Sequence, residues 1–300
     1  MATLQNNHPL HIILADDGSE HAQAAVTLLT TLPLPPESLV TALRVFTPLQ
    51  ASEHATLQAA LDRTQASFTE KGIRAETELL LGYPAEKVIE YADQHRPDLV
   101  VLGAKGLRAT LGILLGGVAQ QVIEYAQWPV LVLRAPFKGL NCVLLAIDGS
   151  SYSHQAAEYL CQSGKFARLP LPVSTEVHVI NVLPPTPVLL PLAEPGTGMM
   201  MPVQTEEITA YQAEEEQQGQ ALLEPILEGL KACGVKANGT LLRGDAATEI
   251  MDYARRHQAD LIVVGSRGLS EVKSWLMGSV SRKLVHYSGC SVLVARGPHP

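Results

Sequence analysis

An internal repeat constrains the fold of this chain more than any other feature. Residues 98–106, DLVVLGAKG, return as residues 260–268, DLIVVGSRG, at an offset of 162. Further pairs share that offset: Gly82 with Gly244, Ala85 with Ala247, Tyr91 with Tyr253, and Gly116 with Gly278. Similarity of this extent at a constant spacing predicts two copies of one fold in a single chain.

The spacing of the repeat also predicts the domain organisation. Asp17 matches Asp148 at an offset of 131, so the second half holds 31 more residues (162 minus 131). We therefore expect domains at residues 1–138 and 139–300, with an insertion at about 184–213.

The insertion is rich in proline, which breaks helices and strand ladders, so we expect a loop. It also carries Met199–Met201. Two interpretations stay open: a surface loop without a binding role, or a lid or docking segment whose methionines make adaptable apolar contacts.

Each half alternates short apolar runs with longer amphipathic segments, which is typical of a parallel sheet covered by helices. The predicted strands are 11–15, 40–45, 75–80, 99–103, 130–134, 142–147, 175–182, 236–242, 261–265 and 291–295. The predicted helices are 19–31, 52–71, 84–95, 117–126, 151–161, 206–233, 246–257 and 279–286. Ser19 and Ser151 are predicted to cap the first helix of each half.

Composition excludes several classes of partner. The net charge is −8, and each half carries −4, so the clustered basic residues that nucleic-acid binding needs are not expected. No apolar run reaches the roughly 18–20 residues of a membrane span, and no basic residue precedes Arg44 to start a signal peptide. The four cysteines form no C-x-x-C pair, which favours free, buried thiols in a reducing compartment. We therefore expect a cytoplasmic protein.

A glycine pattern follows the fourth apolar run of each half. In the second half Gly265, Gly268 and Gly278 precede Ser279 at the start of a predicted helix. Glycines let the backbone approach a ligand closely, and the N–H groups of a helix start bind anions such as phosphate. No lysine follows the last glycine, and the spacing differs from G-x-G-x-x-G. The pattern predicts a nucleotide pocket that is neither a P-loop nor a Rossmann fingerprint.

The glycine pattern and an Asp-Gly-Ser segment earlier in each half together resemble the two motifs of the universal stress protein family. The family pattern is Asp-Gly-Ser after the first strand, here at residues 17–19 and 148–150, and G-x₂-G-x₉-G-[ST] after the fourth. The resemblance covers nearly the whole chain and implies two tandem doubly wound α/β domains. Each would be a five-stranded parallel sheet in the order 3-2-1-4-5, flanked by helices, with its ligand crevice where that order reverses.

Family members that keep the motif bind ATP, so the resemblance implies ATP as the ligand, with or without Mg²⁺. In the second domain it places Asp148 and the Val179 backbone at the adenosine end. It places Gly265 and Gly268 along the ribose and phosphates, and the phosphates themselves at Gly278, Ser279, Val280 and Ser281. Arg267, between the glycines, is within reach of a phosphate, although the motif does not fix that residue.

The first domain carries a weaker version of the site. Its candidate residues are Asp17, Val45, Gly103, Gly106, Gly116 and Gly117. Gly117 and Ala119 stand where the second half has hydroxyl residues. A hydrogen bond to a charged group is worth about 1.5–3 kcal/mol, which is roughly tenfold or more in affinity. We therefore expect nucleotide mainly in the second domain. Asp16 is interpreted as a solvated neighbour, and close packing is an alternative role for Gly103 and Gly106.

No catalytic set and no metal-spaced histidine cluster stands out, so we assign no catalytic or metal-binding residue. The expected function is a regulatory or stress-response role with bound nucleotide. Two alternatives stay open: a weak ATPase or nucleotide hydrolase of the same fold, and an interaction protein that binds no nucleotide. Any ATP hydrolysis should be slow. Because unpaired strand edges favour association, we expect 130–133 and 292–295 to pair within the chain, and a homodimer is possible.

Overall fold

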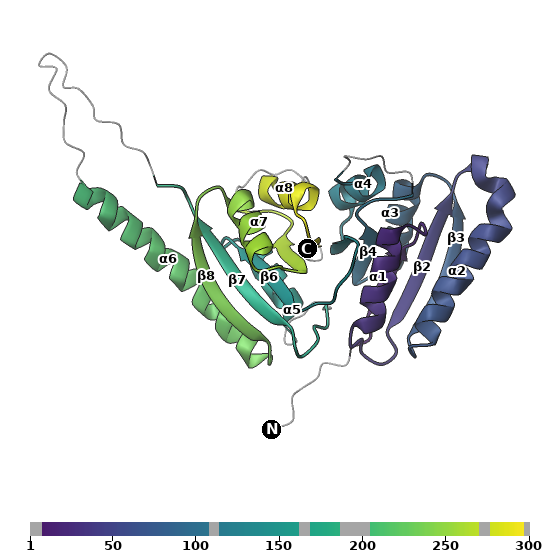
Figure 1. Cartoon of the computed structure of the whole chain (residues 1–300), viewed down its shortest axis with the longest axis horizontal. Coiled ribbons are helices and arrows are strands. Elements are labelled where there is room, and N and C mark those ends of the chain that lie inside the picture. The colour runs from purple at the N-terminus through teal and green to yellow at the C-terminus, as the bar shows by residue number, and fades with distance from the viewer. Residues whose placement is uncertain (1–7, 108–113, 162–168, 187–204, 270–276, 297–300) are drawn as a thin grey trace, which may run out of the picture.

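The computed structural model describes residues 8–107, 114–161, 169–186, 205–269 and 277–296. Ten strands form one sheet in the order β3-β2-β1-β4-β5-β10-β9-β6-β7-β8 (Figure 1). The strands are β1 His11–Ala15, β2 Leu39–Phe46, β3 Arg74–Leu81, β4 Leu99–Gly103, β5 Val130–Leu133, β6 Cys142–Ile147, β7 Glu176–Leu183, β8 Lys236–Arg243, β9 Leu261–Gly265 and β10 Ser291–Ala295. Each half repeats the predicted order 3-2-1-4-5, which confirms the doubly wound α/β fold.

Helices cover both faces of the sheet and explain why its central strands are apolar throughout. The helices are α1 Glu20–Thr31, α2 His54–Thr69, α3 Pro84–His95, α4 Gly117–Tyr125, α5 Ser151–Leu160, α6 Thr205–Ala232, α7 Ala246–Arg256 and α8 Ser279–Tyr287, with a short 3₁₀ helix η1 at Pro48–Glu53. One core contains Leu28 of α1 and Leu223 of α6, and the core on the other face contains Val88 of α3 and Leu284 of α8. A parallel strand buried on both faces reads as a continuous apolar run, as observed.

The two halves meet edge to edge in the middle of the sheet. β5 and β10 pair antiparallel, with Leu131 opposite Leu293 and Val132 opposite Val292. The structure therefore contains the strand pair predicted from the sequence. Burial of all four residues of β5 shows that the seam is also covered on both faces.

The extra residues of the second half do not form a single loop, contrary to the prediction. By strand register, Ala146 takes the place of Ala15, and Ile180 takes that of Leu43. The offset therefore grows from 131 to 137 between the first and second strands, and to 162 by the third. Six of the 31 extra residues lie ahead of β7, and the rest follow it.

Part of the predicted loop is helical. α6 spans 28 residues and begins at Thr205, whereas α2 spans 16. Its predicted start was nearly right, and it overlaps the range 184–213 that was assigned to the insertion. The methionines Met199–Met201 lie outside the described residues.

Two cysteines are paired, which corrects the expectation of four free thiols. Cys161 and Cys233 form a disulfide with their Cα atoms 5.7 Å apart. They are separated by 72 residues in sequence, and they meet because α5 and α6 pack on the same face of the sheet. Cys142 and Cys290 are free, and burial raises the pKa of each thiol to about 11.

The helix that follows the first strand is capped by a serine in each half. The Ser19 hydroxyl accepts a hydrogen bond from the Ala22 N–H, as predicted. In the second half the cap is Ser150, whose hydroxyl accepts from the Ser153 N–H, and not Ser151. In both halves the capping serine is the last residue of the Asp-Gly-Ser motif, so the motif has a structural role whatever it binds.

Candidate functional site

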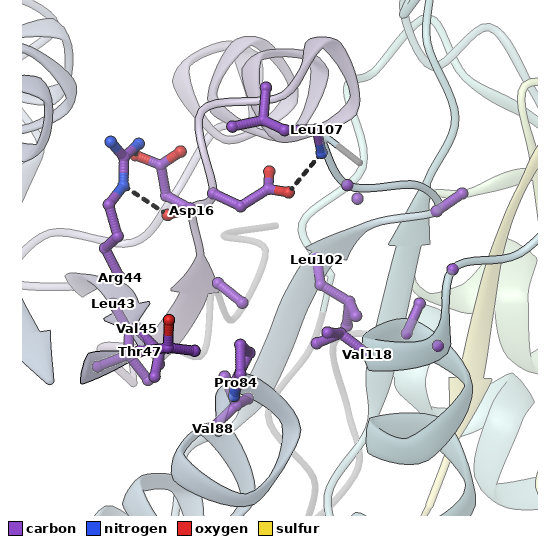
Figure 2. Close-up of a pocket in the computed structure, with 18 of the residues that line it drawn as sticks. Asp16, Leu43, Arg44, Val45, Thr47, Pro84, Val88, Leu102, Leu107 and Val118 are labelled. Atoms are coloured by element: carbon purple, nitrogen blue, oxygen red, sulfur yellow. Dashed lines mark hydrogen bonds and ion pairs between the residues drawn. The ribbon is translucent and has the colours of Figure 1, made fainter. Parts of the chain in front are cut away.

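A cavity of about 460 Å³ opens at the carboxyl ends of β1 and β4 in the first half (Figure 2). This is the place where the strand order reverses, since β1 pairs with β2 on one side and with β4 on the other. All six residues proposed for the first-domain site line it: Asp17, Val45, Gly103, Gly106, Gly116 and Gly117. Residues from four separate stretches of the chain thus converge on one cavity.

Asp17 is held between the two motif loops. Its Oδ1 accepts a hydrogen bond from the Ser19 N–H at 3.0 Å, and its Oδ2 accepts one from the Leu107 N–H at 3.2 Å, drawn as a dashed line in Figure 2. A Cβ at Gly106 would lie 2.6 Å from that Oδ2. Gly106 is therefore required for the carboxylate to reach this position.

Gly103 allows a helix to pack on the end of a strand. A Cβ there would lie 2.7 Å from the Cβ of His21, at the start of α1. Gly265 in the second half is equally tight, with the Tyr152 carbonyl carbon 2.6 Å from the position of a Cβ. Close packing, which the sequence left as an alternative, thus accounts for this glycine in both halves.

The amino end of α4 forms the opposite wall of the cavity. Gly116 is the N-cap residue, and its N–H donates to the Ala104 carbonyl at 2.8 Å. Gly117 and Val118 in the first turn also line the cavity. The space around a Cβ at Gly117 is open, and its φ lies outside the left-handed region. N–H groups of a first helical turn have no partner within the helix, so this end suits an anion.

Asp16 is buried and paired, which corrects its interpretation as a solvated neighbour. Only 4% of the residue is exposed, and its Oδ2 lies 2.9 Å from Nη2 of Arg44. The Thr64 hydroxyl donates to the same oxygen at 2.8 Å, and Nε of Arg44 donates to the Asp16 backbone carbonyl at 2.8 Å. Asp16 follows β1 and Arg44 lies on the neighbouring β2, so only strand register could have revealed the pair.

The second half lacks that ion pair at the corresponding positions. Register places Ile147 and Asn181 at the positions of Asp16 and Arg44. The Asn181 side-chain amide donates to the Ile147 carbonyl at 3.0 Å and is itself 5% exposed. A hydrogen bond between uncharged residues thus takes the place of the ion pair, directly before the second Asp-Gly-Ser motif.

Sequence reasoning also missed the apolar walls of the first cavity. They come from four elements, β2, α2, α3 and β4, and include Leu43, Leu57, Pro84, Val88 and Leu102. No motif marks these residues, because each is an ordinary apolar side chain of its own strand or helix.

The second motif repeats the geometry of the first. Oδ1 of Asp148 accepts from the Ser150 N–H at 3.0 Å, and a Cβ at Gly268 would lie 2.6 Å from Oδ2 of Asp148. Gly278 is the N-cap of α8, with its N–H donating to the Ser266 carbonyl at 2.8 Å. Ser279 is exposed in the first turn of α8, next to the half-buried Val280. The structure thus places these candidates as their first-half counterparts are placed.

Val179 does not belong to this edge of the sheet. It pairs with Leu145 inside the ladder and is fully buried in the core shared with α5 and α6. With the offset of 137 found for the second strand, the counterpart of Val45 is Val182. The predicted contact was wrong because the extra residues ahead of β7 shift this strand relative to the motifs.

Two other second-half candidates have partners within the protein. Nη1 of Arg267 donates to the Tyr152 hydroxyl at 3.1 Å, and its guanidinium lies 5.5 Å from the centre of that ring. The hydroxyl of Ser281, which is 3% exposed, donates to the Gly265 carbonyl at 2.7 Å. Ala119, the counterpart of Ser281, is equally buried. The Ser281 hydroxyl bonds to the protein's own backbone, so its absence at Ala119 removes no donor to a ligand. The difference between the halves that bears on ligand binding is therefore Gly117 in place of Ser279.

Comparison with known families decides the family of this chain. The model of the universal stress protein family matches residues 10–134 and again residues 141–296. The chain belongs to the universal stress protein family. Both matched segments contain the two motifs, the first with Gly117 at the Ser/Thr position, so this is a tandem universal stress protein.

Relatives with one domain and structures with two agree with this result. Universal stress protein YxiE of Bacillus subtilis is 33% identical over 156 residues, which is 52% of this chain and 99% of that protein. Universal stress protein MJ0531 of Methanocaldococcus jannaschii is also 33% identical over 156 residues, covering 52% and 82%.

A universal stress protein structure from Archaeoglobus fulgidus matches with a TM-score of 0.66 at 20% identity, covering 97% of this chain and 98% of its own. One from Pseudomonas aeruginosa UCBPP-PA14, assigned to the family as putative, matches with 0.64 at 16% identity, covering 97% and 94%. At these identities the two structures support the fold. Among the described residues, no helix has the length and apolar character needed to cross a membrane.

The buried Asp16–Arg44 pair gives a stability prediction. Changing Asp16 to Asn leaves a buried guanidinium without its counter-ion, which should lower the free energy of unfolding by about 3–5 kcal/mol. The double variant Asp16→Ile/Arg44→Asn, which copies the second half, should recover most of that loss. Urea denaturation measures both. A double variant as unstable as the single one would contradict this account.

His21 gives a pH prediction. Its Nδ1 accepts a hydrogen bond from the Ala135 N–H at 2.8 Å, which requires an unprotonated nitrogen. Burial, then the charges of Lys105 and Arg134, lower the pKa of His21 below its usual 6.5. The unfolded chain therefore binds more protons, so stability should fall as the pH drops below about 6.5. Thermal unfolding of His21→Gln should show a weaker dependence below that pH, and an unchanged dependence would refute the assignment.

Proposed function

We propose that this universal stress protein binds ATP in both halves, more tightly in the second, and acts as a nucleotide-bound regulatory or stress-response protein. The observation that supports this most is the convergence of six candidate residues, four of them from the two motifs, on the cavity of the first half. Repetition of the Asp and glycine contacts around Asp148 supports a second site of the same kind.

The first cavity suits a nucleotide in its size and in its lining, which offers apolar walls, then a carboxylate and then a helix amino end. Its volume of about 460 Å³ lies within the roughly 300–1,000 Å³ of small-molecule sites. Val45, Pro84, Val88 and Leu102 offer apolar walls for a purine ring. Asp17 stands at the rim with acceptor capacity for ribose hydroxyls, and the amino end of α4 lies where phosphates would bind.

The described residues that line the first cavity are suited to binding a ligand rather than to catalysis. Its carboxylates are Asp16, which is paired with Arg44, and Asp17, whose two oxygens accept backbone N–H groups. Neither is poised as a base, so any hydrolysis of ATP should be slow. Within the described residues no three His, Cys, Asp or Glu side chains cluster to hold a metal. Any magnesium ion would accordingly be coordinated by the phosphates of ATP and would bind together with the nucleotide.

Closing the second site tests its position. In Gly278→Val the new Cβ would lie 3.3 Å from the Arg267 Cα, which forces the glycine loop and the start of α8 apart, so calorimetric titration with ATP should show loss of the tighter site. Ser279→Ala should weaken that site by about 1.5–3 kcal/mol. The matched control is Gly289→Val, since a Cβ at Gly289 meets nothing within 4 Å. Unchanged affinity in Gly278→Val would show that ATP binds elsewhere.

Restoring the missing hydroxyl tests the difference between the halves. Gly117→Ser meets open space in the first turn of α4, and it should strengthen the weaker site by about tenfold. Ala119→Ser should not, because by analogy with Ser281 its hydroxyl would turn to the Gly103 carbonyl. Two equally tight sites in the unmodified protein would show that the backbone amides suffice and that Ser279 adds nothing.

A further inference from the structure

Two equivalent arginines cross the seam in opposite directions. Arg134 follows β5 in the first half, and its Nη2 donates to the Val285 carbonyl of α8 at 2.9 Å. Arg296 follows β10 in the second half, and its Nη2 donates to the Ile123 carbonyl of α4. The offset of 162 relates the two arginines and also relates the two carbonyls. Each half thus donates a side-chain hydrogen bond to a helix of the other half.

Each arginine binds the carboxyl end of its target helix. Val285 lies in the last turn of α8, which ends at Tyr287, and Ile123 lies in the last turn of α4, which ends at Tyr125. Carbonyls there have no partner within the helix, and a cation suits the negative end of the helix dipole. Both contacts are therefore favourable.

The other ends of the same helices form the candidate sites. α4 starts at Gly117 and α8 starts at Ser279, and each first turn lies at the glycine loop of its own half. Val285 and Ile123 each lie six residues after the first residue of their helix, which is about 1.7 turns. A helix packed on the sheet moves as a unit, so holding its carboxyl end also fixes its amino end.

Arg134 also contacts the segment that leads into the first site. Its Nη1 donates to the Leu114 carbonyl at 2.8 Å, two residues before Gly116. The next residue, Ala135, donates its N–H to Nδ1 of His21, the residue that packs on Gly103. Residues 134 and 135 therefore contact two segments next to the first site, at Leu114 and His21, and the helix whose amino end forms part of the second.

We propose that Arg134 and Arg296 are positioning residues that couple the two sites across the seam. Each fixes the glycine loop of the other half through α8 or α4, so that occupancy of one site alters the order of the other. The coupling of ligand binding rests on the proposed function. The positioning itself is a property of the protein without ligand.

Hydrogen exchange of the ligand-free protein tests the positioning. Arg134→Met should accelerate exchange of four hydrogen-bonded amides, those of Gly116, Gln120, Gly278 and Arg282, by about tenfold. Arg296→Met should do the same for the Gln120 amide in the opposite half. Arg134→Lys keeps the charge but lacks the planar fork whose two nitrogens bind the Leu114 and Val285 carbonyls, so its effect should be intermediate. Arg74→Met, at an exposed ion pair on the sheet edge, is the matched control.

The result that would overturn the positioning is acceleration confined to the half that carries the substitution. If Arg134→Met proves too unstable for exchange measurements, Arg134→Lys decides on the same amides. A merely structural role would lower the melting temperature and accelerate exchange in all elements alike, which would also refute the inference.

Adding ATP tests the coupling. In Gly116→Val, where the first site is closed, ATP bound in the second half should still slow exchange of the Gln120 amide, which donates to the carbonyl of residue 116. Adding Arg134→Met and Arg296→Met together should abolish that response while ATP remains bound. A response that survives, or none in Gly116→Val despite bound ATP, would overturn the coupling. Absence of ATP binding to the unmodified protein would instead refute the proposed function, and the ligand-free exchange would still decide the positioning.

Discussion

The antiparallel ladder between β5 and β10 is the contact on which the arrangement of this molecule depends. Its register places Leu131 against Leu293 and relates the halves by a pseudo-twofold axis through the seam. That symmetry brings α4 and α8 near each other over the seam (Figure 1) and puts each C-terminal turn within reach of an arginine from the other half. Without the ladder, Arg134 and Arg296 would have no helix ends to bind.

Within each half, the shape of the site follows from how closely backbone and side chains approach. Gly103 lets α1 pack on β4, and Gly106 lets the Asp17 carboxylate enter the loop. Both approaches are too close for a Cβ, so the two glycines shape the site before any ligand enters. The hydroxyl on α8 that the first half lacks is a smaller difference added to this shared frame, which is why we infer two sites of unequal strength rather than one.

The halves have diverged most where they do not touch each other. The first stabilises its motif corner with the buried Asp16–Arg44 pair, whereas the second uses Ile147 and Asn181. In the second half Glu215 of α6 pairs with Arg243 at the end of β8, and the Cys161–Cys233 disulfide joins α6 to α5. These contacts fix a helix that is longer than its counterpart. The seam and the described glycine positions of the two loops, in contrast, stay closely equivalent.

The sequence by itself determined the repeat, the ten strands and most motif residues, because apolar periodicity and glycine spacing are local properties of a chain. The strand order was implied by the resemblance of those motifs to a known family. Contacts between distant segments were decided by the tertiary structure. Strand register alone pairs Asp16 with Arg44 and excludes Val179 from the site, and helix packing alone joins Cys161 to Cys233. No local pattern records which residues two packed elements bring together, since that depends on how every element between them folds.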